Sequence, residues 1–250
     1  MAGTSSSSSR RSFVLEPTMI KFRDVSFGYE KDDPVLNQVR WDISSGLMLL
    51  LGPNGCGKST LLKLASGVEK PESGTVHING IDLWKKEAEA RKSLAYLPEQ
   101  PDITPYATVR EVLYLVCKLR NEPVSKAHKA LEFFGLQPVS SRTIRELSMG
   151  QRRRAVFSAV LIGEPEHILL DEPLEGMDRK IQPEIIKWIF NRKKAGAGIV
   201  VVSHTIEPFA EEATQAAVVN KGQLFVYDDL PSRIEKKLSL LEALSKGEII

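Results

Sequence analysis

The stretch Gly52-Pro-Asn-Gly-Cys-Gly-Lys-Ser59 decides the fold of this chain, because its spacing, G-x-x-x-x-G-K-S, is that of a phosphate-binding loop. The glycines let successive backbone N–H groups converge on an anion. Lys58 can place a positive charge on the β- and γ-phosphates of a nucleoside triphosphate, and the Ser59 hydroxyl can bind Mg²⁺. The loop therefore predicts a site for a nucleoside triphosphate and Mg²⁺.

The segments on either side of this phosphate loop fit the same interpretation. Residues 47–51 are a short apolar run that predicts a buried strand, and residues 60–65 are predicted to form a helix. That helix would direct the positive end of its dipole toward bound phosphates. A chance glycine-rich turn would not explain a strand before the loop and a helix after it.

Composition places the chain among ordinary globular proteins. Its 250 residues allow one large α/β domain or two small ones, and 42% of them are apolar, which is enough for a normal core. The formal net charge of +2 offers no bulk attraction for nucleic acid, so we expect no nucleic-acid partner. The two cysteines and four histidines follow no disulfide or metal-site spacing. No apolar run approaches the ~18 residues of a membrane-spanning helix, so the chain is not expected to cross a bilayer.

Strand and helix patterns alternate through most of the sequence. The patterns predict strands at 19–27, 47–51, 74–80, 94–97, 168–170 and 199–203, and a hairpin at 217–227 that turns at Lys221-Gly222. They predict helices at 60–65, 84–93, 108–118, 125–134, 151–161, 183–194 and 232–244. Strands that alternate with helices imply a mostly parallel sheet covered on both faces.

The predicted fold is an α/β P-loop NTPase core with a small antiparallel β-subdomain and an inserted α-helical subdomain. We expect the ATP-binding core in two parts, at 19–99 and 151–230. The helical subdomain would occupy 100–150, and a C-terminal helix would lie within 231–250. The serine-rich residues 1–18 are expected to be a disordered leader or a cloning remnant.

Two acids follow the apolar strand predicted at 168–170. In P-loop NTPases an aspartate at such a strand end completes the Mg²⁺ shell, and an adjacent glutamate can polarise the attacking water. With an unperturbed pKa of about 4.3, Glu172 would be ionised near neutral pH and ready to accept a proton. We therefore predict Asp171 as a metal ligand and Glu172 as the catalytic base, rather than two acids that merely end a strand.

The segment Leu147-Ser-Met-Gly-Gln151 contains two separate signals. Ser148 and Gln151 form an S-x-x-Q capping box, which by itself predicts only the start of a helix. The capping box does not explain Gly150, because glycine is costly in the first turn of a helix. A glycine there would allow a further anion to approach the helix N-terminus closely.

At this segment the chain resembles the ATP-binding cassette ATPases, whose signature is L-S-G-G-Q. Met149 departs from the commonest third residue, while the serine and the second glycine are intact. The resemblance extends from about residue 20 to residue 227. It implies that two protomers pack head to tail and that Ser148, Gly150 and Gln151 of one protomer close over the ATP held by the other. The simplest such pair is a homodimer through the nucleotide sites.

The resemblance also implies roles for other residues. Gln100 is similar to the family's Q-loop glutamine, His204 to its switch histidine, and Asp178 to its D-loop aspartate, although that loop is altered to Gly-Met-Asp. Tyr29 is placed like the aromatic residue that stacks on adenine, with Phe27 as a competing candidate. The expected catalytic residues are Glu172, His204 and Gln100, and the expected Mg²⁺ ligands are Ser59, Gln100 and Asp171. The expected ATP-binding residues are Tyr29, Asn54, Gly55, Cys56, Gly57, Lys58, Ser59, Thr60, Ser148, Gly150, Gln151 and Asp178.

The function implied is that of an ABC transporter motor on the cytoplasmic face of the membrane. The chain would bind and hydrolyse ATP, and dimer closure would drive transport through membrane-spanning subunits on separate chains. Those subunits would dock a coupling helix on residues 100–147. Residues 108–113 and 152–154 are similar to exporter-type motors. The alternative is a soluble ATPase of the same family that acts as a nucleotide-dependent switch or assembly scaffold.

Overall fold

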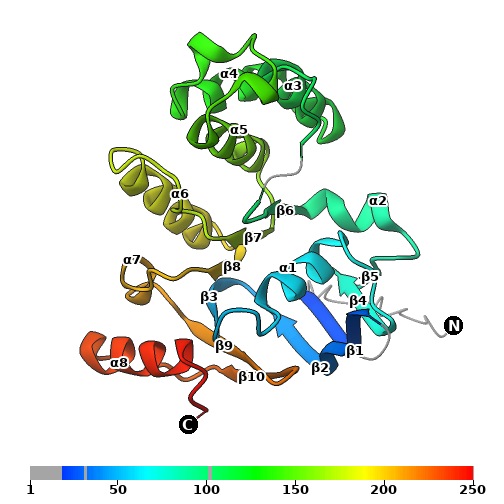
Figure 1. The fold of residues 1–250 in the computed structure, drawn as a ribbon, viewed down its shortest axis with the longest axis vertical. Helices are drawn as coiled ribbons and strands as arrows, with labels where there is room; N and C mark the ends of the chain where they lie inside the picture. The colour runs from blue at the N-terminus through cyan, green and yellow to red at the C-terminus, as the bar shows by residue number, and fades with distance from the viewer. Residues whose placement is uncertain (1–18, 31–32, 101–102, 250) are drawn as a thin grey trace, which may run out of the picture.

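The computed structural model describes residues 19–30, 33–100 and 103–249, so the predicted leader at 1–18 lies outside the described residues. The chain forms two sheets and a group of helices that stands apart from them (Figure 1). The larger sheet has the strand order β10-β9-β3-β8-β7-β6, and the smaller sheet has the order β2-β1-β4-β5.

The larger sheet is mostly parallel, as predicted. Its parallel strands are β3 (Gly46–Leu51), β6 (Leu94–Leu97), β7 (His167–Asp171), β8 (Gly198–Val202) and β9 (Gln215–Asn220), and β10 (Gln223–Tyr227) pairs antiparallel with β9. The phosphate loop follows β3, and the acids predicted as metal ligand (Asp171) and catalytic base (Glu172) lie at the end of β7. Both therefore lie at the carboxyl edge of the sheet, where open α/β folds bind their ligands.

The smaller sheet is antiparallel and consists of β1 (Ile20–Glu30), β2 (Asp33–Ile43), β4 (Ser73–Ile78) and β5 (Ile81–Asp82). The long strand β2 escaped prediction. Its pairing with β1 shifts register several times, and Gln38 has a φ of +49°, which interrupts the alternation of buried and exposed side chains.

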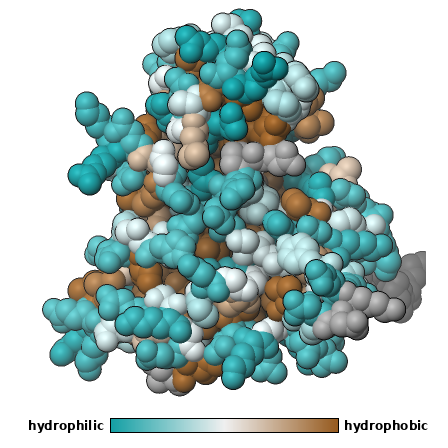
Figure 2. All heavy atoms as spheres, in the orientation of Figure 1, coloured by the Kyte–Doolittle hydropathy of each residue, from teal (hydrophilic) through white to brown (hydrophobic). Residues whose placement is uncertain are grey.

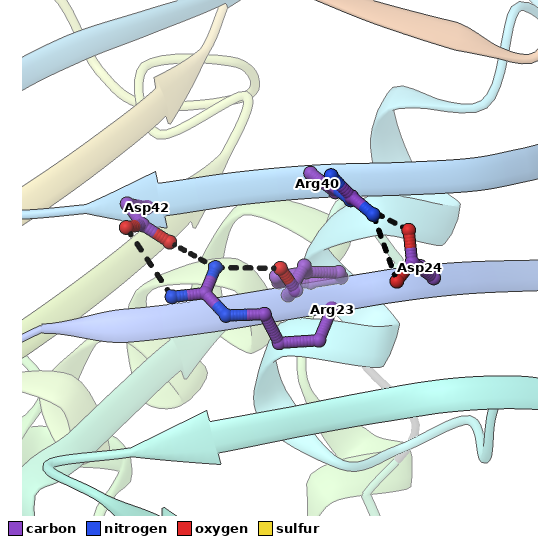
Figure 3. Close-up of polar contacts among 5 residues, drawn as sticks. Arg23, Asp24, Arg40 and Asp42 are labelled. Carbon is purple, nitrogen blue, oxygen red and sulfur yellow. Dashed lines mark hydrogen bonds and ion pairs between the residues drawn. The ribbon is translucent and has the colours of Figure 1, made fainter.

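Two ion pairs join β1 and β2 on the solvent face of the smaller sheet (Figure 3). Arg23 Nη1 lies 2.7 Å from Asp42 Oδ1, and Arg40 Nε lies 2.6 Å from Asp24 Oδ1. The Arg40 guanidinium lowers the pKa of Asp24 chiefly through this hydrogen bond. Because all four side chains are well exposed, these pairs contribute little to the stability of the fold.

Helix α1 (Lys58–Ser66) lies between the two sheets, and the alternation of β3 explains why. Met48 and Leu50 point to a buried core shared with α1 and the smaller sheet. Leu47 and Leu49 point to a second core on the opposite face, which is covered by other helices. Burial on both faces holds β3 and α1 in place, and this fixes the phosphate loop that joins them.

Helices α3 (Val109–Leu119), α4 (Val124–Phe133) and α5 (Met149–Leu161) form a separate group at the top of Figure 1, here called the helical lobe. The predicted capping boxes at Thr108 and Ser148 are both present. The boundary predicted after residue 150 falls inside α5, and we propose Leu161 as the end of the lobe.

The remaining helices lie against the larger sheet. Helices α6 (Gln182–Lys194), α7 (Glu207–Ala210) and α8 (Ile234–Ser245) contribute to the core opposite α1. Helix α2 (Glu87–Ala90) is shorter than the helix predicted at 84–93, because the chain tightens into a 3₁₀ turn at Arg91–Ser93. Within the described ranges, every helix is too short or too polar to span a membrane.

Candidate active site

A cavity of about 490 Å³ lies at the carboxyl edge of the larger sheet, between the phosphate loop and the end of β7. Its volume is in the range of small-molecule sites. It brings together most of the predicted phosphate-loop residues with the two acids, the histidine and the aromatic residue. The lining residues are Tyr29, Val35, Asn54, Gly55, Gly57, Lys58, Ser59, Thr60, Glu99, Asp171, Glu172, Val202 and His204.

The shape of the phosphate loop depends on its glycines. Gly52 and Gly57 have φ values of +130° and +110°, a region that side-chain-bearing residues rarely adopt. Helix α1 begins at Lys58, directly after Gly57. Lys58 Nζ donates hydrogen bonds to the carbonyl oxygens of Gly52, at 2.8 Å, and Pro53, at 2.9 Å. The loop thus presents an ammonium group and a helix N-terminus to one cavity.

Cys56 is the one predicted residue of the phosphate loop that does not line this cavity. Its side chain packs against the core between α1 and the smaller sheet. Burial raises the pKa of the Cys56 thiol, which therefore stays protonated at neutral pH. The predicted nucleotide contact of Cys56 can come only from its backbone.

Asp171 is almost fully buried, with 1% of its surface exposed. Burial raises the pKa of its carboxyl group, and a hydrogen bond from the Ser59 side chain opposes this shift. Asp171 Oδ2 is buried and has no hydrogen-bond partner among the described residues. A buried oxygen of this kind needs a partner, and carboxylate and hydroxyl oxygens are the ligands that Mg²⁺ prefers. The donors present therefore fit a magnesium ion.

Glu172 is buried beside His204 and has an unusual backbone. Its φ is +50°, in the left-handed region that a glutamate seldom occupies. The His204 backbone N–H donates to Glu172 Oε2 at 3.2 Å, and His204 Nε2 lies 3.6 Å from Glu172 Oε1. Burial raises the pKa of Glu172 above its ordinary value, which makes its carboxylate a stronger base than one in water.

The two aromatic candidates for adenine stacking differ in exposure. Tyr29 is 56% exposed and lines the cavity, whereas Phe27 is 6% exposed and belongs to the core. The two rings meet edge to face, with centroids 5.0 Å apart. Tyr29 Oη lies 3.4 Å from Thr60 Oγ1 and accepts a hydrogen bond from Lys63 Nζ. Of the two, only Tyr29 is positioned to meet a ligand in this cavity.

Gln100, which is expected to be a metal ligand and catalytic residue, does not line this cavity. It lines a neighbouring cavity of about 510 Å³ together with Met149 and Arg152. The preceding residue, Glu99, lines both this neighbouring cavity and the phosphate cavity, and its charge contributes to the raised pKa of Asp171. The position one residue earlier therefore faces the phosphate loop, and it carries a carboxylate.

The four predicted residues from the signature and the D-loop also lie outside the phosphate cavity. Ser148 Oγ accepts a hydrogen bond from the Gln151 N–H at 3.2 Å, and Gln151 Oε1 accepts one from the Ser148 N–H at 3.0 Å. Asp178 accepts a hydrogen bond from the Lys180 N–H near the start of α6. With Gly150, these residues flank no part of the cavity in their own protomer.

Glu99 and Arg153 were not among the residues predicted from the sequence. Arg153, on α5, lies behind the two acids and donates hydrogen bonds to their backbone carbonyl oxygens. An acid beside a glutamine and the middle residue of an arginine run form no local pattern. Only the packing of α5 against β6 and β7 could identify them.

Comparisons with known proteins agree with this geometry. A family model described as ABC transporter matches residues 36–175. A protein of Pyrococcus horikoshii named as an ABC transporter ATP-binding protein is 34% identical over 212 residues, which are 82% of this chain and 82% of that protein. The sulfate/thiosulfate import ATP-binding protein CysA of Thermosynechococcus vestitus is 34% identical over 76% of this chain and 58% of its own length. A solved dimeric bacterial ABC transporter cassette matches with a TM-score of 0.75 at 23% identity, over 86% of this chain and 99% of that chain.

Proposed function

Because the chain belongs to the ABC transporter family and is an ATPase, we propose that it is a transporter motor that closes as a homodimer on two ATP molecules. It acts at the cytoplasmic face of a membrane, through membrane-spanning subunits on separate chains. One observation supports the proposed homodimer. The cavity of a single protomer holds the phosphate loop, the two acids and His204, but not Ser148, Gly150 or Gln151.

The residues of this cavity have separate roles in ATP hydrolysis. Lys58 and the N–H groups of the phosphate loop bind the β- and γ-phosphates. Ser59 and Asp171 would hold Mg²⁺, which neutralises phosphate charge when bound. Glu172 accepts a proton from the water that attacks the γ-phosphate, and the His204 N–H fixes one oxygen of that carboxylate.

Two further roles complete the proposal for the nucleotide. Tyr29 stacks on adenine, because its ring is exposed at the cavity while Phe27 is not. Glu99 replaces Gln100 as the polar residue that faces the metal side of the cavity, because Glu99 lines it and interacts with Asp171. Glu99→Gln should therefore change the Mg²⁺ concentration that half-saturates ATP hydrolysis, while Gln100→Ala should not.

The first turn of α5 fits an anion from outside its own chain. A Cβ atom added to Gly150 would lie 3.4 Å from the Gly176 carbonyl oxygen, an ordinary contact, so packing within the chain does not require this glycine. Met149 beside it is 86% exposed. The free N–H groups and the dipole of this 13-residue helix favour negative charge. The γ-phosphate held by a second protomer meets these requirements.

Glu172→Gln tests the catalytic and dimer proposals together. The variant should bind ATP, lose hydrolysis and remain a dimer, because the γ-phosphate that holds the two protomers together is no longer removed. Size exclusion with light scattering in ATP and Mg²⁺ measures the mass, and phosphate release measures turnover. A variant that stays monomeric while it hydrolyses ATP normally would overturn both proposals.

An apolar groove on the helical lobe supports docking to a membrane subunit. The groove has a volume of about 390 Å³, and Figure 2 shows hydrophobic residues gathered on this lobe. In this proposal the groove binds apolar side chains of a helix from the membrane-spanning subunit. Its apolar lining residues are Tyr96, Pro98, Ile103, Val112, Val116, Leu119, Val156, Ala159 and Val160.

Two exposed leucines of α3 provide a matched test of this docking. Leu119 lines the groove and is 72% exposed, whereas Leu115 is 56% exposed and lies outside it. Leu119→Glu should abolish recovery of a polytopic membrane protein with the chain from detergent extract, and Leu115→Glu should retain it. Equal recovery with both variants would exclude the groove as the docking site.

Export is the proposed direction of transport, supported by the sequence at 108–113 and 152–154. Import is the second candidate, because the CysA relative is named as an import protein. Vesicles that carry the membrane subunit, with ATP on the face that binds this chain, separate the two. ATP-dependent loss of cargo from that face would support export, and gain of cargo on that face would support import.

A further inference from the structure

Arg153 is heavily hydrogen-bonded beside the phosphate cavity, and it lines the neighbouring cavity rather than the phosphate cavity itself. It extends from α5 to the ends of β6 and β7, and only 6% of its surface is exposed. Its guanidinium donates to four backbone carbonyl oxygens. These belong to Pro98 at 2.7 Å, Glu99, Asp171 at 2.7 Å and Glu172 at 2.5 Å.

Burying a guanidinium costs free energy unless its N–H groups are hydrogen-bonded. Burial lowers the pKa of Arg153, and the charges of nearby carboxylates oppose this shift. Its fork of N–H donors satisfies carbonyl groups from two separate segments, which an apolar side chain of the same size cannot do. The arrangement is therefore a clamp that joins the loop after β6 to the end of β7.

The clamp acts where the backbone needs support. The left-handed conformation of Glu172 persists only if its surroundings hold it. The Glu172 N–H donates to the Val202 carbonyl oxygen at 2.9 Å, and Arg153 binds the Glu172 carbonyl oxygen. With both backbone groups of Glu172 held, the direction of its Cα–Cβ bond is fixed, and the His204 N–H holds the carboxylate at the other end of the side chain.

We propose that Arg153 is a positioning residue for ATP hydrolysis, which transmits the position of α5 to the carboxylates of Asp171 and Glu172. This inference rests on the proposed roles of those two acids. The first turn of α5 carries Ser148 and Gly150, only a few residues from Arg153 along the same helix. A shift of α5 toward a second protomer therefore moves the clamp, and with it the backbone of both acids.

We expect substitution of Arg153 to lower kcat without changing the affinity for ATP. Arg153 makes no hydrogen bond to the phosphate loop, so Lys58 and Ser59 should still bind nucleotide. Misplacing catalytic groups by about 1 Å can reduce turnover roughly 10²-fold. Arg153→Met removes all four bonds, and Arg153→Lys keeps the charge but loses the planar fork.

Arg192→Lys is the matched control. Arg192 also donates to a backbone carbonyl oxygen, that of Pro165 at 3.0 Å, but at the opposite end of β7. All three variants are assayed as the full chain, with fluorescent ATP for Kd, phosphate release for kcat, and circular dichroism for folding. Arg192→Lys should keep both constants. Both Arg153 variants should keep Kd within about twofold and lose kcat about tenfold or more.

The Glu172→Gln background separates this inference from the proposed function. If Arg153 acts through Glu172, Arg153→Lys should lower the residual kcat of the Glu172→Gln variant much less than it lowers the wild-type kcat. Folded Arg153 variants with wild-type kcat, or with Kd and kcat weakened equally, would overturn the inference. If Arg153→Met does not fold, Arg153→Lys decides by the same two constants. Should Glu172→Gln itself retain hydrolysis, the role of Glu172 fails instead.

Discussion

Replacing His167 by glutamine should reduce the acid sensitivity of this fold. His167 begins β7, and none of its surface is exposed. Its Nε2 lies 2.9 Å from Asn79 Oδ1, which also accepts a hydrogen bond from the Met19 N–H. His167 Nδ1 is buried and has no partner among the described residues. A proton added at Nδ1 would create a buried charge with no acceptor, and burial lowers the pKa of His167 to about 4.

The sign of the effect follows from the two pKa values. The unfolded chain takes up a proton on His167 near pH 6.5, whereas the folded chain resists it until about pH 4. The contribution of neutral His167 to the free energy of unfolding is therefore fully present above pH 6.5 and is lost as the pH falls toward 4. Between pH 7 and pH 5 the loss from this one group amounts to about 2 kcal/mol.

Urea unfolding of the full chain at pH 7, 6 and 5 measures this contribution. His167→Gln is neutral at every pH, so its free energy of unfolding should fall less between pH 7 and pH 5 than that of the wild type, by about 2 kcal/mol. His128→Gln, which removes an exposed imidazole, is the control. Parallel curves for wild type and His167→Gln would refute the argument from burial.

Three further predictions concern the phosphate loop and the smaller sheet. Lys58→Ala should weaken ATP binding about tenfold or more, measured by titration calorimetry, because it removes the charge next to the phosphates; an unchanged Kd would contradict its role. Gly247→Ala places a Cβ atom 3.1 Å from Pro53 Cδ at a φ of +83°, and it should weaken ATP binding. Gly196→Ala has similar strain, at a φ of +93°, but no neighbour within 4 Å, and should not. Arg40→Gln should leave the thermal midpoint nearly unchanged, because its ion pair is exposed, and a clear drop would show otherwise.

Contiguous motifs made much of the fold predictable. The phosphate loop is set by glycines whose positive φ values no other residue tolerates well, and the capping box at Ser148 uses only neighbouring residues. The apolar run at 47–51 predicted the buried strand β3. Strand β2 could not be found in this way, because its bulged pairing with β1 breaks the period of two.

Side-chain direction after a strand was not predictable from sequence. Gln100 matched the residue type that the family resemblance implied, yet Glu99 lines the phosphate cavity. Which of two adjacent residues faces a cavity depends on the path of the backbone after β6, and that path is held by Arg153 on α5. A contact between residues more than fifty positions apart leaves no local pattern in the sequence.

Helix α5 connects the proposed sites of this chain. Its first turn faces the proposed second protomer, Arg153 clamps the backbone of the two acids, and Val156 and Val160 line the apolar groove. An α-helix of 13 residues is about 20 Å long and moves largely as a rigid unit. A displacement of its first turn therefore also moves Arg153 beside the acids and the valines in the groove. One stiff element thus connects the proposed ATP-dependent closure to hydrolysis and to the proposed membrane subunit, and no separate relay between the three sites is needed.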